Sequence, residues 1–220
     1  MPRRLPDTIA IDGPAASGKT TVGMAIAEKY GYLFLDTGLM YRAVTLAALR
    51  SNIPATSEAA RKLLMYLSLS VQVTRDGTRV LLGAEDVTVH LRDADVEARV
   101  SDYAAIPEVR EAMVRQQRAI AAKGNAVLAG RDIGTVVLPN APLKLYFHAS
   151  EDARAERRGS QAIQAAEAAR RDIANRDKKD SGREVSPLKP AADAIVIDTT
   201  NMVLEDVVKL ALEKVSCASV

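Results

Sequence analysis

Tryptophan is absent from the 220 residues, and six tyrosines and two phenylalanines make up the whole aromatic content. So few rings argue against a protein that binds single-stranded nucleic acid by stacking bases on aromatic side chains. The 30 lysines and arginines nearly balance the 28 aspartates and glutamates, and the net charge is +2. A charge so close to neutral gives no broad attraction to nucleic acid or to a membrane surface. We therefore expect neither of these as a partner.

Cysteine is almost as scarce, because Cys217 is the only one in the chain. A single cysteine excludes an internal disulfide framework and a metal cage built from several thiolates. No uninterrupted run of 18 apolar residues suggests a membrane span, and the start MPRRLPDTIAIDG has too few apolar residues before Asp12 for a secretory signal. These absences predict a cytoplasmic protein, and we expect it to be a monomer.

The rest of the chain alternates short apolar runs with segments of helical period, which is typical of parallel strands joined by crossover helices. The length and the 48% hydrophobic content favour a single α/β domain over residues 1–220 with one compact core and an insertion. The expected elements are strands at 9–12, 33–36, 126–129, 143–147 and 195–198, and helices at 19–30, 107–124 and 203–215.

Two segments depart from this alternation. Residues 69–91 change to period two, with the runs SVQVT, RDGTRVLL and EDVTVHL and a turn signal at Asp76-Gly77, so we expect a small antiparallel insert. Residues 150–189 hold ten basic and eight acidic residues, few large apolar ones, and the run KKDSGREVSP, which we expect to be irregular. This second segment is predicted to be a solvated, mobile flap.

Residues 13–20, GPAASGKT, match the phosphate-binding pattern G-x-x-x-x-G-K-[ST]. They follow an expected strand and open an expected helix, where backbone amides can surround phosphate oxygens. In such a loop Lys19 bridges the β and γ phosphates and the Thr20 hydroxyl binds Mg²⁺. The sequence therefore predicts a bound nucleoside triphosphate.

The remaining residues favour a kinase for a small acceptor over a regulatory GTPase. The guanine-reading string Asn-Lys-x-Asp is absent, and its nearest counterpart, at 175–177, lacks the lysine. Transfer to a phosphate acceptor needs no base, since a phosphate ester is largely ionised at pH 7, but it needs fixed cations to overcome repulsion. Candidate guanidinium groups are those of Arg42, Arg131, Arg154, Arg157, Arg158, Arg176 and Arg183.

Longer motifs narrow the interpretation to one family. The segments GPAASGKTT, LDTGLMYRA, SDYAAIPEVREAMVRQQR, GRDIGTVVLPNAPLK and RDKKDSGREVSPLKPAADAIVIDTT occur in this order. With them the chain resembles the bacterial cytidylate kinases from about Asp7 to Val215. The resemblance implies a P-loop kinase with a five-stranded parallel sheet, a monophosphate-binding insert at about 57–106 and a lid at about 150–189. It also implies transfer of the γ-phosphate of ATP to CMP or dCMP, with Mg²⁺.

The resemblance also assigns roles to individual positions. ATP would be bound by Gly13, Pro14, Ala15, Ala16, Ser17, Gly18, Lys19, Thr20, Thr21 and Arg157, and Mg²⁺ by Thr20. The acceptor phosphate would meet Thr37, Arg42 and Arg131, the sugar Asp180, and the cytosine Ser101, Arg110 and Asp132. Lid residues Arg176 and Arg183 would bind CMP, close over the transferring group and join Lys19 and Arg131 as catalytic groups.

Departures from the family pattern leave other interpretations open. Ala129 stands where the family usually has an acidic residue, so the part of that carboxylate around Mg²⁺ is either missing or taken by Asp36. The lid is also shorter than in many relatives. His90 and His148 have no companions at ligand spacing, and we expect both to be structural or exposed. The alternatives are a kinase for UMP, AMP or a hydroxylated metabolite, and a non-catalytic nucleotide switch.

Overall fold

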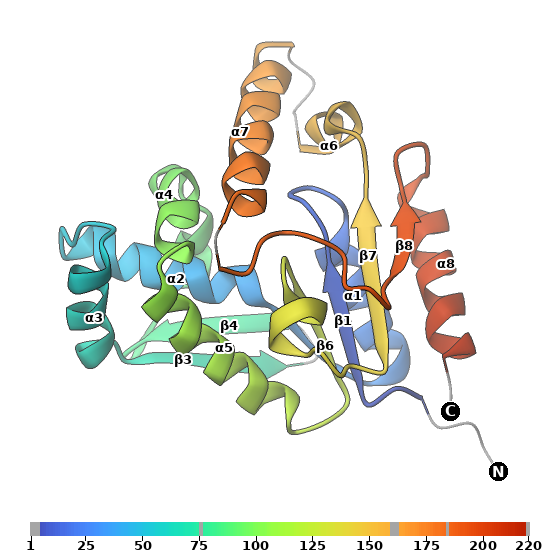
Figure 1. Cartoon of the computed structure of the whole chain (residues 1–220), viewed down its shortest axis with the longest axis horizontal. Coiled ribbons are helices and arrows are strands. Elements are labelled where there is room, and N and C mark those ends of the chain that lie inside the picture. The colour runs from blue at the N-terminus through green and yellow to red at the C-terminus, as the bar shows by residue number, and fades with distance from the viewer. Residues whose placement is uncertain (1–4, 75–76, 159–162, 184, 219–220) are drawn as a thin grey trace.

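A five-stranded parallel sheet forms the centre of the chain in our computed structural model, which describes residues 5–74, 77–158, 163–183 and 185–218 (Figure 1). Its strand order is β2-β6-β1-β7-β8. The predicted α/β fold is confirmed, and each predicted strand agrees within one residue at either end. The strands are β1 (Thr8–Asp12), β2 (Leu33–Asp36), β6 (Ala126–Gly130), β7 (Leu143–His148) and β8 (Ile195–Asp198).

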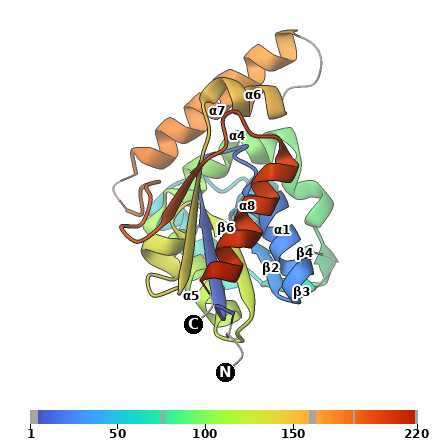
Figure 2. The same cartoon turned by 90° about the vertical axis from the view of Figure 1, so that its right-hand side faces the viewer.

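Helices cover both faces of this sheet, which explains why its strands are continuous apolar runs. One face packs on α1 (Lys19–Tyr30) and α8 (Leu204–Cys217), where Val22, Ile26 and Val207 share a core with the strands. The other face packs on α2 (Thr37–Arg50) and α5 (Pro107–Ala121). Figure 2 shows α1 and α8 together on one side of the sheet.

The topology places a crevice at the carboxyl end of β1. The chain leaves β1 through α1 to β2 on one side, whereas β7 pairs with β1 on its other side. Ligands of open α/β sheets bind at such a switch point, beyond the carboxyl ends of the strands. The residues at these ends, Asp12, Asp36 and Gly130, therefore border the expected site.

The antiparallel insert is confirmed for two strands and is shorter than predicted in the third. Strands β3 and β4 pair in antiparallel fashion, whereas β5 has two residues and the run after it is a 3-10 helix. Asp86 Oδ1 accepts hydrogen bonds from the Thr88 amide at 3.0 Å and the Thr88 hydroxyl at 2.6 Å, which turns the chain away from the strand. Asp76 of the predicted turn lies outside the described residues. The elements are α3 (Ser57–Tyr66), β3 (Leu69–Thr74), β4 (Gly77–Leu82), β5 (Glu85–Asp86), the 3-10 helix Thr88–Arg92 and α4 (Ala94–Ala104).

The predicted flap contains two helices, α6 (Glu151–Arg158) and α7 (Ile163–Ser181), beyond the carboxyl end of the sheet (Figure 1). The prediction of an irregular KKDSGREVSP run is wrong at its start, because α7 continues to Ser181. The run 178–181 contains neither glycine nor proline, so the helix ends only where Gly182 follows. Within the described residues, no helix is both long and apolar enough to cross a membrane.

Candidate active site

The loop between β1 and α1 has the backbone geometry that the phosphate-binding pattern predicts. Gly13 has φ +148°, and a Cβ there would lie 2.3 Å from the Phe147 carbonyl oxygen. Gly18 is the N-cap of α1 at φ +88°, a conformation that side chains disfavour. The loop therefore meets the N-terminus of α1, where unpaired amides and the helix dipole attract anions.

Lys19 is buried at the start of α1 and bends back over the loop. Its Nζ donates to the Pro14 carbonyl oxygen at 2.5 Å and to Ser17 Oγ at 3.1 Å. Burial, and then the charge of Arg131, hold the pKa of Lys19 well below its usual range. Neutral oxygens compensate a buried ammonium poorly, so a phosphate anion would be a better partner.

Thr20 and Asp36 form the pair that could hold Mg²⁺. The Thr20 hydroxyl donates to Asp36 Oδ2 at 3.2 Å, and Asp36 Oδ1 accepts from the Gly38 amide at 3.0 Å. Over the described part of the chain, no group of three His, Cys, Asp or Glu residues could make a metal cage. Mg²⁺ usually takes one or two protein oxygens plus phosphates and water, so these two residues fit it. His90 and His148 are both exposed, as predicted.

Two of the predicted acceptor-phosphate residues lie at the start of α2. Thr37 is buried and donates from Oγ1 to the Ala129 carbonyl oxygen at 2.9 Å. Arg42 donates from Nε to Glu97 Oε1 at 2.6 Å, while Glu97 Oε2 accepts from Arg176 at 2.6 Å. One carboxylate of α4 thus holds an arginine of α2 beside an arginine of α7.

The residues predicted to read cytosine gather where α5 faces the turn after β6. Arg110 and Asp132 form a short ion pair, and their side chains are only 4% and 5% exposed. The Arg110 guanidinium lies 5.5 Å from the centre of the Tyr41 ring. Ser101 is buried beside them, with its hydroxyl 3.5 Å from Asp180 Oδ1.

Asp180, near the end of α7, connects this region with two more arginines. It accepts from Arg131 Nε at 2.9 Å and also pairs with Arg183. Burial by itself would raise the pKa of Asp180, but the charges of Arg131 and Arg183 bring that pKa below its usual value. The three side chains form a partly buried charged cluster with a net positive charge.

Arg157, on α6, contacts the segment that follows β8. Its guanidinium donates to Thr199 Oγ1 at 3.1 Å and also to the Thr199 carbonyl oxygen, so it is fixed against the segment after β8. Met202, Val203 and Leu204 of that segment line the same cavity. Together with Val207 they give the cavity an apolar section of lining.

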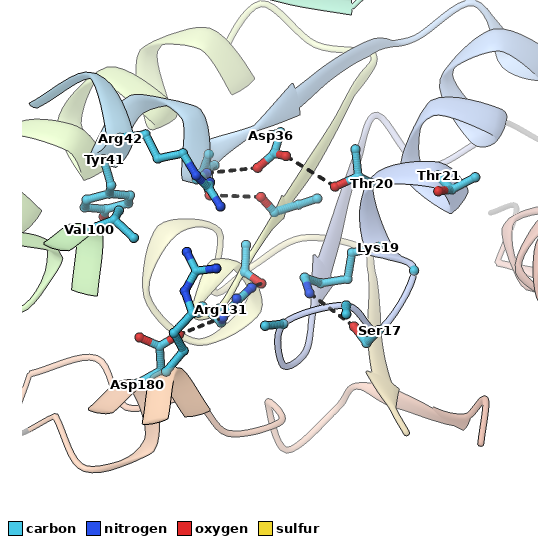
Figure 3. Close-up of a pocket in the computed structure, with 18 of the residues that line it drawn as sticks. Ser17, Lys19, Thr20, Thr21, Asp36, Tyr41, Arg42, Val100, Arg131 and Asp180 are labelled. Atoms are coloured by element: carbon cyan, nitrogen blue, oxygen red, sulfur yellow. Dashed lines mark hydrogen bonds and ion pairs between the residues drawn. The ribbon is translucent and has the colours of Figure 1, made fainter. Parts of the chain in front are cut away.

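A single cavity of about 930 Å³ connects these groups. In Figure 3, Lys19 and Thr20 face Arg42 and Tyr41 across it, with Arg131 and Asp180 beside them. Gly13 and Pro14 are the predicted site residues that do not line it. The structure brings together Ala15, Ala16, Ser17, Gly18, Lys19, Thr20, Thr21, Asp36, Thr37, Arg42, Ser101, Arg110, Arg131, Asp132, Arg157, Arg176, Asp180 and Arg183.

Asp12 is buried at the end of β1 and was not among the residues predicted for the site. Its two carboxylate oxygens accept from the Ile133 and Gly134 amides, each at 2.7 Å, so it fixes the turn that follows Asp132. Burial raises the pKa of Asp12 to about 6. A carboxylate at the end of an otherwise apolar strand is the sequence signal that could have identified it.

A second missed contact joins the flap to the phosphate-binding loop. Asp177 Oδ1 accepts from the Ala15 amide at 3.2 Å, and Arg154 donates to the Ala15 carbonyl oxygen at 3.1 Å. Arg154 and Asp177 also pair with each other. Arg154 was only a candidate cation in the sequence, and Asp177 gave no signal, because the contact joins residues 162 positions apart.

Comparisons with known proteins agree with this geometry. The family model "Cytidylate kinase" matches residues 9–217. The cytidylate kinase of Streptococcus thermophilus is 48% identical over 215 residues, covering 94% of both chains, and that of Bacillus subtilis is 44% identical over 214 residues, covering 94% of this chain and 96% of its own. A solved Eubacterium ventriosum protein with 14% identity and a TM-score of 0.51 covers 96% of this chain and 98% of its own, and shares the fold alone. The chain belongs to the cytidylate kinase family.

Proposed function

We propose that this protein transfers the γ-phosphate of ATP to CMP or dCMP, giving ADP and CDP or dCDP. The observation that carries the proposal is the single cavity, which has the phosphate-binding loop on one side and the buried Arg110–Asp132 pair on the other. Six further arginines line the same cavity, which suits two anionic substrates. The family match supports the proposal, because the relatives reported above are named cytidylate kinases.

The donor would bind at the loop of residues 13–21. Backbone amides at the N-terminus of α1 would surround its phosphates, and the Lys19 ammonium would exchange its neutral partners for phosphate oxygens. The adenine would lie against the apolar segment of Met202 and Val203, beside Arg157. Mg²⁺, held near Thr20 and Asp36, would neutralise charge on the phosphates.

The acceptor phosphate would need no general base, because its second pKa is about 6 and it is already a nucleophile at pH 7. The obstacle is repulsion between two anions. Arg42, Arg131, Arg176 and Arg183 would supply the fixed positive charge that offsets this repulsion and stabilises the transferring group. Thr37 would position the acceptor phosphate at the start of α2.

Cytosine recognition would depend on the buried pair. Cytosine offers an N4 amino donor beside the N3 and O2 acceptors. The Asp132 carboxylate would accept from N4, and Arg110 would donate to N3 or O2. Ser101 would tune the affinity, and Asp180 would meet the sugar hydroxyls.

The wider organisation is proposed on the same basis. Residues 1–220 would form one kinase domain, with residues 57–106 acting as the monophosphate-binding insert and residues 150–189 as a lid. The Asp177 contact with Ala15 supports a lid that closes on the donor loop. We propose that the enzyme works as a cytoplasmic monomer on small nucleotides.

The test is ADP release with ATP and each of CMP, dCMP, UMP and AMP. The proposal predicts fast release with CMP and dCMP, and release at least about 10² slower in kcat/KM with UMP and AMP. Comparable rates with UMP or AMP would favour a kinase for another acceptor. ATP binding without release to any acceptor would favour a nucleotide switch.

A further inference from the structure

Glu97 joins the insert to both the start of α2 and the lid helix, through two arginines of the cavity. Its Oε1 accepts from Arg42 Nε and its Oε2 from Arg176, both at 2.6 Å. The three side chains are 17%, 18% and 13% exposed for Arg42, Glu97 and Arg176, and all three line the cavity. The carboxylate therefore lies where two cations converge from α2 and α7.

We propose that Glu97 is a positioning residue, which holds Arg42 and Arg176 side by side for the acceptor phosphate. Two guanidinium groups repel each other, and each belongs to a long side chain with many rotamers. A carboxylate that bridges the two guanidinium groups offsets their repulsion and fixes their side chains before the substrate arrives. Less side-chain conformational freedom is then lost on binding. The Arg42 contact uses Nε, and its two terminal nitrogens make no hydrogen bond with any described residue, which leaves them for a phosphate.

The same contact admits an opposite effect, in which the carboxylate competes with the phosphate for the arginines. Competition predicts that removing the charge of Glu97 tightens CMP binding, because the local potential becomes more positive. Positioning predicts weaker binding instead, since the arginines are no longer paired. The geometry favours positioning, because each arginine donates to a separate oxygen of Glu97 and the carboxylate lies between them.

The inference rests on the proposed acceptor-phosphate role of Arg42 and Arg176, and a phosphate-free ligand isolates that role. We would measure Kd for CMP and for cytidine, by calorimetry, with the wild-type protein and with Glu97→Gln. We expect Glu97→Gln to weaken CMP about tenfold while cytidine and the KM for ATP stay within about twofold. An equal loss for CMP and cytidine would show a merely structural role.

A neighbouring ion pair provides the matched control. Asp102 accepts from Lys179 at 2.6 Å, which also joins α4 to α7, but this pair is more exposed and neither residue lines the cavity. Asp102→Asn should leave the CMP affinity within about twofold. If it weakens CMP as much as Glu97→Gln does, the effect comes from joining the two helices and not from positioning the arginines.

A second variant keeps the test valid if Glu97→Gln does not fold, as judged by circular dichroism. Glu97→Asp keeps the charge but is one methylene too short to reach both arginines, and we expect an intermediate loss of CMP affinity. Tighter or unchanged CMP binding in either folded variant overturns the inference. Failure of the wild-type protein to phosphorylate CMP would instead overturn the proposed function on which the inference rests.

Discussion

Arg110 and Asp132 form an ion pair in which both side chains are almost fully buried, and the Tyr41 ring lies against the guanidinium. Taking two charges out of water is costly, so such a pair is weak support for stability. It suits the proposed recognition role, because it offers a donor and an acceptor next to each other in the cavity. This arrangement matches the donor and acceptor pattern of cytosine and opposes that of uracil.

The first prediction concerns this pair. Asp132→Asn keeps the shape of the side chain but adds an amide donor that can meet O4 of uracil. We expect the variant to lose most of its kcat/KM for CMP and its CMP-to-UMP ratio to fall at least about tenfold. Steady-state kinetics with both acceptors measure the ratio. A constant ratio, with both efficiencies reduced together, would move cytosine recognition to other residues.

Much of the fold follows from the sequence for a physical reason. Strands buried on both faces are continuous apolar runs, so β1 and β2 were predicted to within a residue. Gly31 marks the end of α1 and Pro107 the start of α5, so these two helix ends were also predicted. The strand predicted over EDVTVHL failed because Val87 and Leu91 are buried while Val89 is exposed, whereas a strand would place all three side chains on one face. Its alternation alone did not reveal the turn made by Asp86 and Thr88.

The site was predictable only in part. The phosphate-binding loop is a local pattern, so Lys19 and Thr20 could be placed from the chain itself. The pairing of Glu97 with Arg42 and Arg176 joins residues 55 and 79 positions apart, and no local pattern reports such a contact. Distant pairs of this kind became visible only when the fold brought α2, α4 and α7 together.

The second prediction tests the donor side. Lys19→Ala removes an ammonium that we expect to contact the donor phosphates, and it should reduce kcat/KM by about 10² or more while circular dichroism remains native-like. Lys29→Ala, in the last turn of the same helix and exposed, is the control and should keep full activity. Turnover of Lys19→Ala within a few-fold of the wild type would show that the donor site is assigned wrongly.

The third prediction tests the lid. Arg183 pairs with Asp180 and lines the cavity, so Arg183→Met removes a charge expected to act mainly on the transferring group. We expect kcat to fall about 10³ with little change in the KM for ATP. Arg171→Met, at an exposed position of α7, should have no such effect. Equal losses in kcat and ATP affinity would contradict a role in the transition state.

The fourth prediction uses the titration of Asp12. Because burial raises its pKa from 3.8 to about 6, the folded protein holds a proton that the unfolded chain releases, and this contribution to stability is lost as pH rises through 6. Asp12→Asn cannot bind this proton, and its NH₂ group replaces one of the two oxygens that accept from backbone N–H donors. The variant should therefore be less stable than the wild type at pH 4. Its deficit in the free energy of unfolding should shrink by up to about 3 kcal/mol between pH 4 and pH 7.

Urea unfolding of both proteins across this pH range measures the deficit. Titrating residues that do not interact with Asp12 contribute equally in both proteins and cancel in the difference. A deficit that stays constant with pH would show that Asp12 is ionised throughout the range.

The central claim is that one cavity selects cytidine monophosphate as the acceptor for the γ-phosphate of ATP. The most direct measurement places equal concentrations of CMP and UMP in one vessel with limiting ATP and determines CDP and UDP by chromatography. The product ratio equals the ratio of the two kcat/KM values, and the account predicts about 100 to 1 or more in favour of CDP. A ratio near one, or ADP formed without either diphosphate, would contradict it.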